Sequence, residues 1–282
     1  MRPDKSPSGI AKLRLALAAV RRGEHPRDKL AIAYVLVLYP LFPLARFLRK
    51  LGLHLPGPGW LVREYRCGSE GFIYRCPGDG PYFLFCDPRH DPGVRDIVNR
   101  LNEGIFVDVG SHVGFFSLPA ARKLAGRGGV VAIEPHPIRF EFLRDNVCRN
   151  RLDNVICLPY ALSDRDGQGI IYDLDRTLGE HTRDVSFAPT QGRPISVNLR
   201  KLDTVCQELG LDTVSVVKID VEGFEANVIA GMSQTIARWS PQVVFEALTP
   251  QAVESCRRVL ASFGYAIRPV DSTNYLAERL AT

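Results

Sequence analysis

The chain has 282 residues, of which 45% are hydrophobic and 24% are charged, as in an ordinary globular protein with a sizeable core. Its net charge of +5 is unevenly spread, because residues 1–50 hold eleven Lys or Arg and three Asp or Glu, which leaves −3 for the remainder. The rest of the chain is thus not basic, and a nucleic acid is not expected as a partner, since proteins that bind one carry a basic stripe at the binding site.

The N-terminal sixty residues form a basic and apolar extension, predicted to be helical in part. Residues 30–45 contain no charged side chain, and basic residues flank them. This run is shorter than the roughly twenty residues that cross a bilayer, and Pro40 and Pro43 interrupt a helix. Two interpretations remain open: peripheral contact of residues 30–50 with an anionic membrane surface, or a helix packed on the domain or on a second copy.

A secretory signal is not expected, because the apolar run begins late and no clean cleavage site follows it. The expected localisation is cytoplasmic, at the cytoplasmic face of the membrane if the extension binds lipid. Residues 61–282 are predicted to form the main globular domain. Its lead-in at residues 61–103 is predicted to contain a hairpin that turns at residues 77–81, followed by a helix at residues 94–101.

A glycine-containing loop follows the buried strand predicted at residues 105–109. Glycine tolerates positive φ and lets the backbone approach a ligand closely. A second apolar run, residues 130–133, ends in Glu134, where a carboxylate can accept hydrogen bonds from two ribose hydroxyls. The predicted cofactor contacts of these two strand ends are Asp108, Gly110, Ser111, His112, Gly114, Glu134 and Pro135.

The first loop distinguishes two classes of cofactor. A dinucleotide site uses a glycine two places after the first one, so that the pyrophosphate can approach the helix, whereas this loop has His112 there. Asp108 would repel a pyrophosphate but attract an amino or sulfonium group. The loop therefore favours S-adenosylmethionine, and an NAD(P)-dependent oxidoreductase is the alternative.

Alternating apolar runs and helical stretches predict β-α-β units in an α/β fold. The predicted strands are residues 105–109, 130–133, 155–158, 214–219 and 243–245, and the main predicted helices are residues 138–150 and 222–236. Ligands of such sheets bind beyond the carboxyl ends of the strands, and carboxylates gather at those ends in this sequence.

Four motifs together closely resemble the FkbM family of S-adenosylmethionine-dependent methyltransferases. They are the loop Asp108 to Gly114, the pair Glu134 and Pro135, the turn Ala161-Leu162-Ser163-Asp164, and the run Lys218-Ile219-Asp220-Val221-Glu222-Gly223. The resemblance implies a class I methyltransferase (Rossmann-like) fold: a mostly parallel seven-stranded sheet with helices on both faces. It also implies S-adenosylmethionine as cofactor, with Ala161, Leu162 and Asp220 among its contacts, and transfer to a hydroxyl oxygen. His112 and His136 depart from the family pattern.

Asp220 is the residue expected to touch the methyl acceptor or the methionine amino group, because it lies at the carboxyl end of its strand. Glu222 and Glu246 are the competing bases. Lys218 points to the same face as Asp220 and is expected to hold that carboxylate ionised, or to accept a proton itself if burial lowers its pKa. An ion pair with a purely structural role is the alternative. Mg²⁺ bound by these carboxylates also remains open, but the spacing does not require it and no metal ligand is assigned.

Residues 164–200 are predicted to be an antiparallel flap on the substrate side of the site, as the family resemblance implies. Candidate contacts to sugar hydroxyls are Arg176, Glu180, His181, Thr182 and Arg183, together with Arg89 and His90 from the lead-in. The expected acceptor is a sugar of a glycan, a glycolipid or a polyketide-like metabolite. A non-catalytic, membrane-attached relative of the fold is a further alternative. Seven scattered cysteines indicate neither a zinc site nor a disulfide framework.

Overall fold

The computed structural model describes residues 16–38, 61–173, 185–186 and 193–280, and divides the chain into two compact units. The first unit extends to Pro88, and the second begins at Arg89. The sugar contacts predicted at residues 176–183, and most of the apolar run at residues 30–50, lie outside the described residues. Membrane contact of that run and the domain boundary at residue 60 therefore stay predictions.

The first unit contains helix α2 (Pro26–Leu38), strands β1 (Glu64–Ser69) and β2 (Phe72–Pro77), and the short helix η3 (Tyr82–Leu84). The two strands form an antiparallel hairpin. The predicted turn at residues 77–81 is wrong, because the hairpin turns at Glu70 and Gly71. Their φ values of 50° and 80° match the two-residue turn that follows the natural twist of a hairpin.

Helix α2 packs on strand β1 through Asp28. One carboxylate oxygen of Asp28 accepts the N–H of Arg66 at 3.0 Å, and the other accepts the N–H of His25 at 2.9 Å. Ile32 and Val35 are buried on the same side of the helix. The helix is thus fixed to the hairpin, as the packed-helix interpretation expects for this part of the extension. Across the described ranges, no helix has both the length and the apolar character needed to span a membrane.

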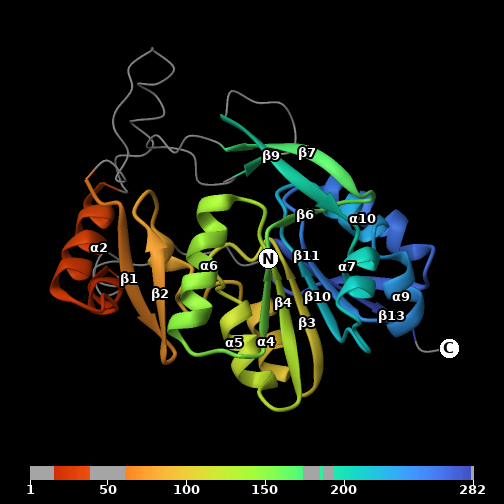
Figure 1. The fold of residues 1–282 in the computed structure, drawn as a ribbon, viewed down its shortest axis with the longest axis horizontal. Coiled ribbons are helices and arrows are strands. Elements are labelled where there is room, and N and C mark those ends of the chain that lie inside the picture. The colour runs from red at the N-terminus through yellow and green to blue at the C-terminus, as the bar shows by residue number, and fades with distance from the viewer. Residues whose placement is uncertain (1–15, 39–60, 174–184, 187–192, 281–282) are drawn as a thin grey trace, which may run out of the picture. The chain divides into compact units, whose positions relative to one another are not determined.

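The second unit is built around the seven-stranded sheet at the centre of Figure 1. In spatial order its strands are β12 (Tyr265–Pro269), β13 (Asn274–Arg279), β11 (Gln242–Glu246), β10 (Val216–Ile219), β3 (Gly104–Val109), β4 (Gly128–Ile133) and β5 (Val155–Leu158). Strand β13 runs in the opposite direction to the other six strands of this sheet. This order and direction confirm the predicted class I methyltransferase fold.

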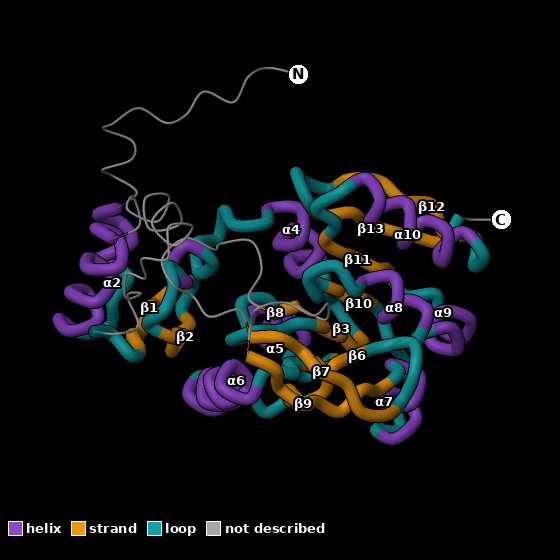
Figure 2. Tube along the Cα trace, turned by 90° about the horizontal axis from the view of Figure 1, so that it is seen from above, coloured by secondary structure: helices purple, strands orange, loops and turns teal. Residues whose placement is uncertain are grey.

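Helices cover both faces of this sheet, as Figures 1 and 2 show. One face carries α4 (Pro92–Arg100), α5 (Ser117–Leu124) and α6 (Pro137–Arg149), and the other carries α7 (Leu202–Glu208), α8 (Glu225–Ala230), α9 (Ser233–Trp239) and α10 (Pro250–Ala261). The core beneath α7 to α10 is aliphatic and contains alternate strand residues such as Val107, Val217 and Val243. The intervening residues, Asp108 and Lys218 among them, face the opposite helices, because successive strand side chains point to opposite faces.

The single helix predicted at residues 222–236 is wrong, since α8 and α9 replace it. The first helix begins only at Glu225, because Glu222 and Gly223 have φ values of 59° and 99°. The two helices separate at Gly231, whose α-carbon lies against the carbonyl of Ser163. A Cβ at Gly231 would lie 2.0 Å from that oxygen, so the break occurs where the helix backbone touches the backbone of Ser163.

The predicted flap, together with the strand before it, forms a separate sheet. Its strands are in the order β6 (Tyr160–Leu162), β9 (Arg193–Arg200), β7 (Gly167–Asp173) and β8 (Val185–Ser186). Strand β7 is antiparallel to β9, in agreement with the predicted flap, whereas β6 is parallel to β9. The motif described above as a turn is therefore partly strand, because Ala161 and Leu162 lie in β6. We refer to these four strands as the second sheet.

Candidate active site

The loop after β3 is shaped by close backbone contacts. Gly110 has a φ of 77°, and a Cβ there would lie 1.9 Å from the carbonyl oxygen of Asp220, so only glycine fits. His112 also lies in the left-handed region, with a φ of 54°. The hydroxyl of Ser111 donates to the carbonyls of Asp108 and Ile133 at 3.1 and 3.0 Å. The loop is thereby tied to the ends of β3 and β4.

Glu134 is held at the end of β4 by two backbone donors. Its Oε2 accepts the N–H of His112 at 2.9 Å, and its Oε1 accepts the N–H of His136 at the same distance, beyond the intervening Pro135. A carboxylate has about four acceptor positions, so each oxygen keeps one for a further donor. This arrangement fits the two hydroxyls of a ribose. Glu134, the loop and its glycines are therefore suited to hold S-adenosylmethionine.

Asp108 is completely buried and faces helix α5. The hydroxyl of Ser117 donates to its Oδ2 at 2.5 Å, and Lys218 Nζ lies 3.5 Å from Oδ1. The strand register explains the second contact, since Lys218 and Asp108 are paired positions of β10 and β3. Its negative charge is thus balanced by a protein cation. Direct contact between Asp108 and a cofactor stays a prediction.

Lys218 is the central cation of the site. Its Nζ lies 3.2 Å from Asp220 Oδ2 and 5.3 Å from the ring centroid of Phe116, which Arg95 also contacts at 5.3 Å. Burial alone would lower the pKa of Lys218, but the carboxylates of Asp220 and Asp108 outweigh it and raise the pKa. The lowered pKa that Lys218 would need to accept a proton is therefore not found, and this alternative is wrong. The two carboxylates therefore favour the protonated form of the side chain.

Glu246 ends β11, next to the strand that carries Asp220. Burial, and then repulsion by Asp220, raise the pKa of Glu246 to about 8, against the opposing effect of Lys218. Both acids are half-buried, and 35% of the Asp220 side chain is exposed. The site thus pairs an accessible carboxylate with an acid that titrates near neutral pH, which suits general acid–base chemistry.

Two acids near Glu246 were not among the predicted catalytic residues. Glu225, at the start of α8, is buried; burial raises its pKa although Oε1 accepts the N–H of Gly223 at 2.8 Å. Asp91 lies at the N-terminus of α4, and His90 Nε2 is 3.1 Å from its Oδ2. The pKa of Asp91 is lowered against the effect of burial, first by His90 and then by Lys218. Both acids stand at the start of a helix, and this position is the sequence signal that could have identified them.

The predicted residues that come together are thus Asp108, Lys218, Asp220 and Glu246, with Gly110, Ser111, His112 and Glu134 at the neighbouring strand ends. Glu222 lies in the loop before α8, and its competing role as base stays a prediction. The side chains of Ala161 and Leu162 are buried in β6, so cofactor contacts there also stay predictions. No three Cys, His, Asp or Glu side chains within the described ranges are grouped so as to hold a metal ion.

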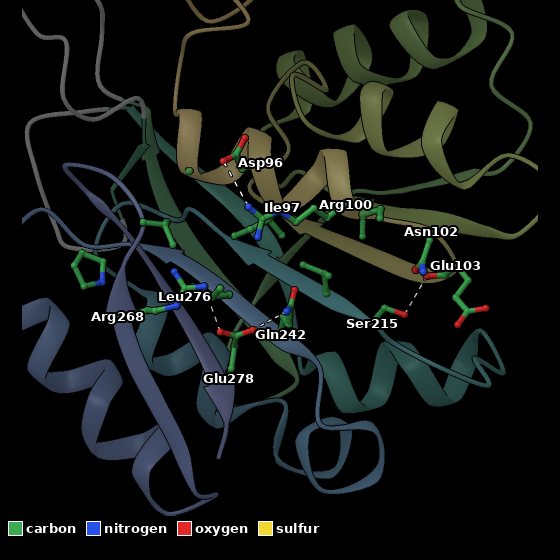
Figure 3. Close-up of a pocket in the computed structure, with 15 residues that line it drawn as sticks. Asp96, Ile97, Arg100, Asn102, Glu103, Ser215, Gln242, Arg268, Leu276 and Glu278 are labelled. Carbon is green, nitrogen blue, oxygen red and sulfur yellow. Dashed lines mark hydrogen bonds and ion pairs between the residues drawn. The ribbon is translucent and has the colours of Figure 1, made fainter. Parts of the chain in front are cut away.

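A pocket of about 440 Å³ opens at the amino-terminal ends of the central strands, opposite the ends that carry the candidate active site (Figure 3). Its polar side chains contact one another: Gln242 donates to Glu278 at 2.7 Å, and Arg268 lies 3.4 Å from the second oxygen of Glu278. Ser215 donates to the carbonyl of Glu103. Because ligands of such sheets bind at the carboxyl ends of the strands, this pocket is separate from the candidate active site.

Known proteins resemble the chain over the same region. The model of the Methyltransferase FkbM domain matches residues 108–267, more than half of the sequence. The 31-O-demethyl-FK506 methyltransferase FkbM of Streptomyces tacrolimicus is 30% identical over 69% of this chain and 80% of its own length. The 2-O-methyltransferase NoeI of Sinorhizobium fredii is 28% identical over 55% of this chain and 72% of its own.

A third relative, the hexuronic acid methyltransferase AglP of Haloferax volcanii, is 27% identical over 66% of this chain and 69% of its own length. These matches are to methyltransferases, so the two alternatives, an NAD(P)-dependent oxidoreductase and a non-catalytic relative of the fold, are wrong. The match to the family model begins at Asp108 and includes the glycine loop, Glu134, Lys218 and Asp220. The chain belongs to the FkbM family and is a methyltransferase that uses S-adenosylmethionine as its cofactor.

Proposed function

We propose that this enzyme methylates a hydroxyl oxygen of a sugar in a glycan or glycolipid, or of a polyketide-like metabolite. The observation that carries the proposal is the pair formed by Asp220 and Glu246, because a hydroxyl must lose its proton as its oxygen becomes a nucleophile. The relatives named above support oxygen as the acceptor atom, since two of their names specify O-methylation and the third a hexuronic acid.

Each residue of the pair has a separate task in this proposal. When bound, S-adenosylmethionine supplies a methyl group on a positively charged sulfur. Asp220, whose carboxylate lies 3.2 Å from Lys218 Nζ, orients the acceptor by accepting a hydrogen bond from a neighbouring hydroxyl, so that the proton of the reacting hydroxyl is left for Glu246. Glu246 takes the proton, because a pKa of about 8 lets its carboxylate bind a proton more strongly than an ordinary glutamate does. Lys218 stays protonated and balances the charge of the neighbouring acids.

A panel of methyl acceptors tests this proposal. The full-length protein is incubated with S-adenosylmethionine carrying a trideuterated methyl group and with neutral glycosides, uronic acids, glycolipids and hydroxylated polyketides. Mass spectrometry then identifies labelled products, and fragmentation locates the label on oxygen, nitrogen or carbon. Label on a hydroxyl oxygen supports the proposal. Label exclusively on nitrogen or carbon contradicts it, and an amine-bearing acceptor included as a comparison makes that outcome visible.

The pKa of Glu246 predicts opposite pH dependences for activity and stability. Methyl transfer is expected to rise with pH to a plateau above about 8, as Glu246 becomes the carboxylate that takes the proton. Stability should fall over the range between the ordinary pKa of 4.5 and about 8, because the folded protein then binds a proton that the unfolded chain has lost. Urea unfolding and initial rates at several pH values measure both. Glu246→Gln should remove this contribution to the stability profile, and an unchanged profile would contradict the assignment.

A further inference from the structure

His136 lies between the cofactor-binding strand and the second sheet. It is two residues beyond Glu134, and its side chain is only 4% exposed. Its backbone N–H donates to Glu134 Oε1 at 2.9 Å, so the backbone of His136 determines how that carboxylate is oriented. The ribose of the cofactor is predicted to bind at Glu134, whereas the proposed catalytic acids Asp220 and Glu246 are at the ends of other strands. The role of His136 therefore has to be sought in what its ring contacts.

The two ring nitrogens of His136 have different partners. Nδ1 accepts the backbone N–H of Arg139 at 3.4 Å, at the start of helix α6, which puts the ring proton of the neutral form on Nε2. Nε2 lies 3.3 Å from Oδ2 of Asp173. The residue thus contacts three elements: the end of β4 through its backbone, α6 through Nδ1, and strand β7 through Nε2.

Asp173 is the last residue of β7 in the second sheet. Arg193, its cross-strand partner on β9, contacts the same carboxylate oxygen at 3.1 Å but is 66% exposed. The contact with His136 is first among the causes that lower the pKa of Asp173 to about 2 against the effect of burial. The contact between Asp173 and His136 thus joins the second sheet to the residue that lies two positions beyond Glu134.

We infer that His136 is a positioning residue that couples cofactor binding at Glu134 to the docking of β7 on the start of α6. A cofactor that fixes Glu134 also fixes the backbone of His136, and hence the ring that holds Asp173. Coupling between two sites is reciprocal, so loss of the contact with Asp173 weakens cofactor binding as well. The inference depends on the cofactor of the family and is independent of which acceptor is methylated.

Two substitutions break the link in different ways. His136→Asn keeps a side chain that caps a helix well but is too short to reach Asp173. Asp173→Asn keeps the shape of the second partner and removes its charge. Arg193→Gln is the matched control, because it removes the exposed contact to the same carboxylate and leaves His136 unchanged. Should one of the first two variants fail to fold, the other still tests the inference.

Hydrogen exchange of each protein, with and without S-adenosylhomocysteine, provides the measurement, together with calorimetric binding of the same compound. In the wild type and Arg193→Gln, S-adenosylhomocysteine is expected to slow amide exchange in β7. In His136→Asn and Asp173→Asn, the dissociation constant of S-adenosylhomocysteine should rise by about fivefold or more. At saturation the compound should not slow amide exchange in β7 of these variants. A contact with only a structural role would raise β7 exchange equally with and without the compound. That result, or wild-type affinity in both variants, overturns the inference.

Discussion

Replacing Glu246 with glutamine is expected to reduce methyl transfer by roughly a hundredfold or more, the usual contribution of a positioned general base. Glutamine has nearly the same shape as glutamate but cannot take the proton of the acceptor hydroxyl. The free energy of unfolding should not fall, because the substitution removes a buried acid that Asp220 repels. The turnover number, measured at saturating concentrations of both substrates, is the quantity to compare.

The matched control for this substitution is Glu254→Gln. Glu254 lies on helix α10, is half exposed, and forms surface ion pairs with Arg257 and Arg258. Its loss should leave the turnover number unchanged, since surface pairs contribute little. The substitution Asp220→Asn distinguishes the roles of the two acids. If Asp220 orients the acceptor, this variant should bind the acceptor more weakly and also turn over more slowly. Full activity of Glu246→Gln would assign the base to Asp220 or Glu222 instead.

Replacing Lys218 with methionine is expected to lower the free energy of unfolding by about 3–5 kcal/mol, the usual cost of leaving a buried charge without its partner. Methionine fills most of the space of the lysine side chain, so the loss is mainly electrostatic. Asp108 has no solvent exposure and would lose the cation 3.5 Å from its Oδ1. Because the pKa of Lys218 is raised, this contribution is fully present below about 10.5 and declines only at more alkaline pH.

A double substitution distinguishes this charge effect from lost packing. Lys218→Met combined with Asp108→Asn should be more stable than the sum of the single losses predicts, because neither charge is then left unpaired. Lys123→Met on the exposed side of α5 is the control and should change stability little. Chemical denaturation of the four proteins gives the comparison. Strict additivity of the two single losses would contradict the ion-pair account.

Much of the fold could be predicted from the sequence because its central strands are buried on both faces. Such strands have continuous apolar runs, and the observed bounds of β3, β4 and β11 differ by two residues or fewer from the predicted ones. The hairpin turn was harder to locate, because Pro77 and the glycines after it are stronger turn signals than Glu70 and Gly71. The break at Gly231 depends on the distant carbonyl of Ser163, which local patterns do not reveal.

Those residues of the site that lie at the ends of strands could be predicted from the sequence. Asp220 and Glu246 follow adjacent strands, so their proximity could be expected from topology. The ionisation of Lys218 could not, because burial and two carboxylates act on its pKa in opposite directions, and only their distances decide the outcome. The link between His136 and Asp173 was also out of reach, since it joins residues of two sheets whose relative placement no motif specifies.

The chain enters the segment between β6 and the end of β9 and leaves it at neighbouring positions, Ser163 and Arg200. The N–H of Ser163, just after β6, donates to the carbonyl of Arg200 at the end of β9, at 2.9 Å. An insertion whose two ends are hydrogen-bonded to each other can change in length or sequence without stretching the sheet that holds the cofactor. The segment between Ser163 and Arg200 could consequently be exchanged between family members as one unit, provided that the carboxylate of Asp173 that contacts His136 is kept.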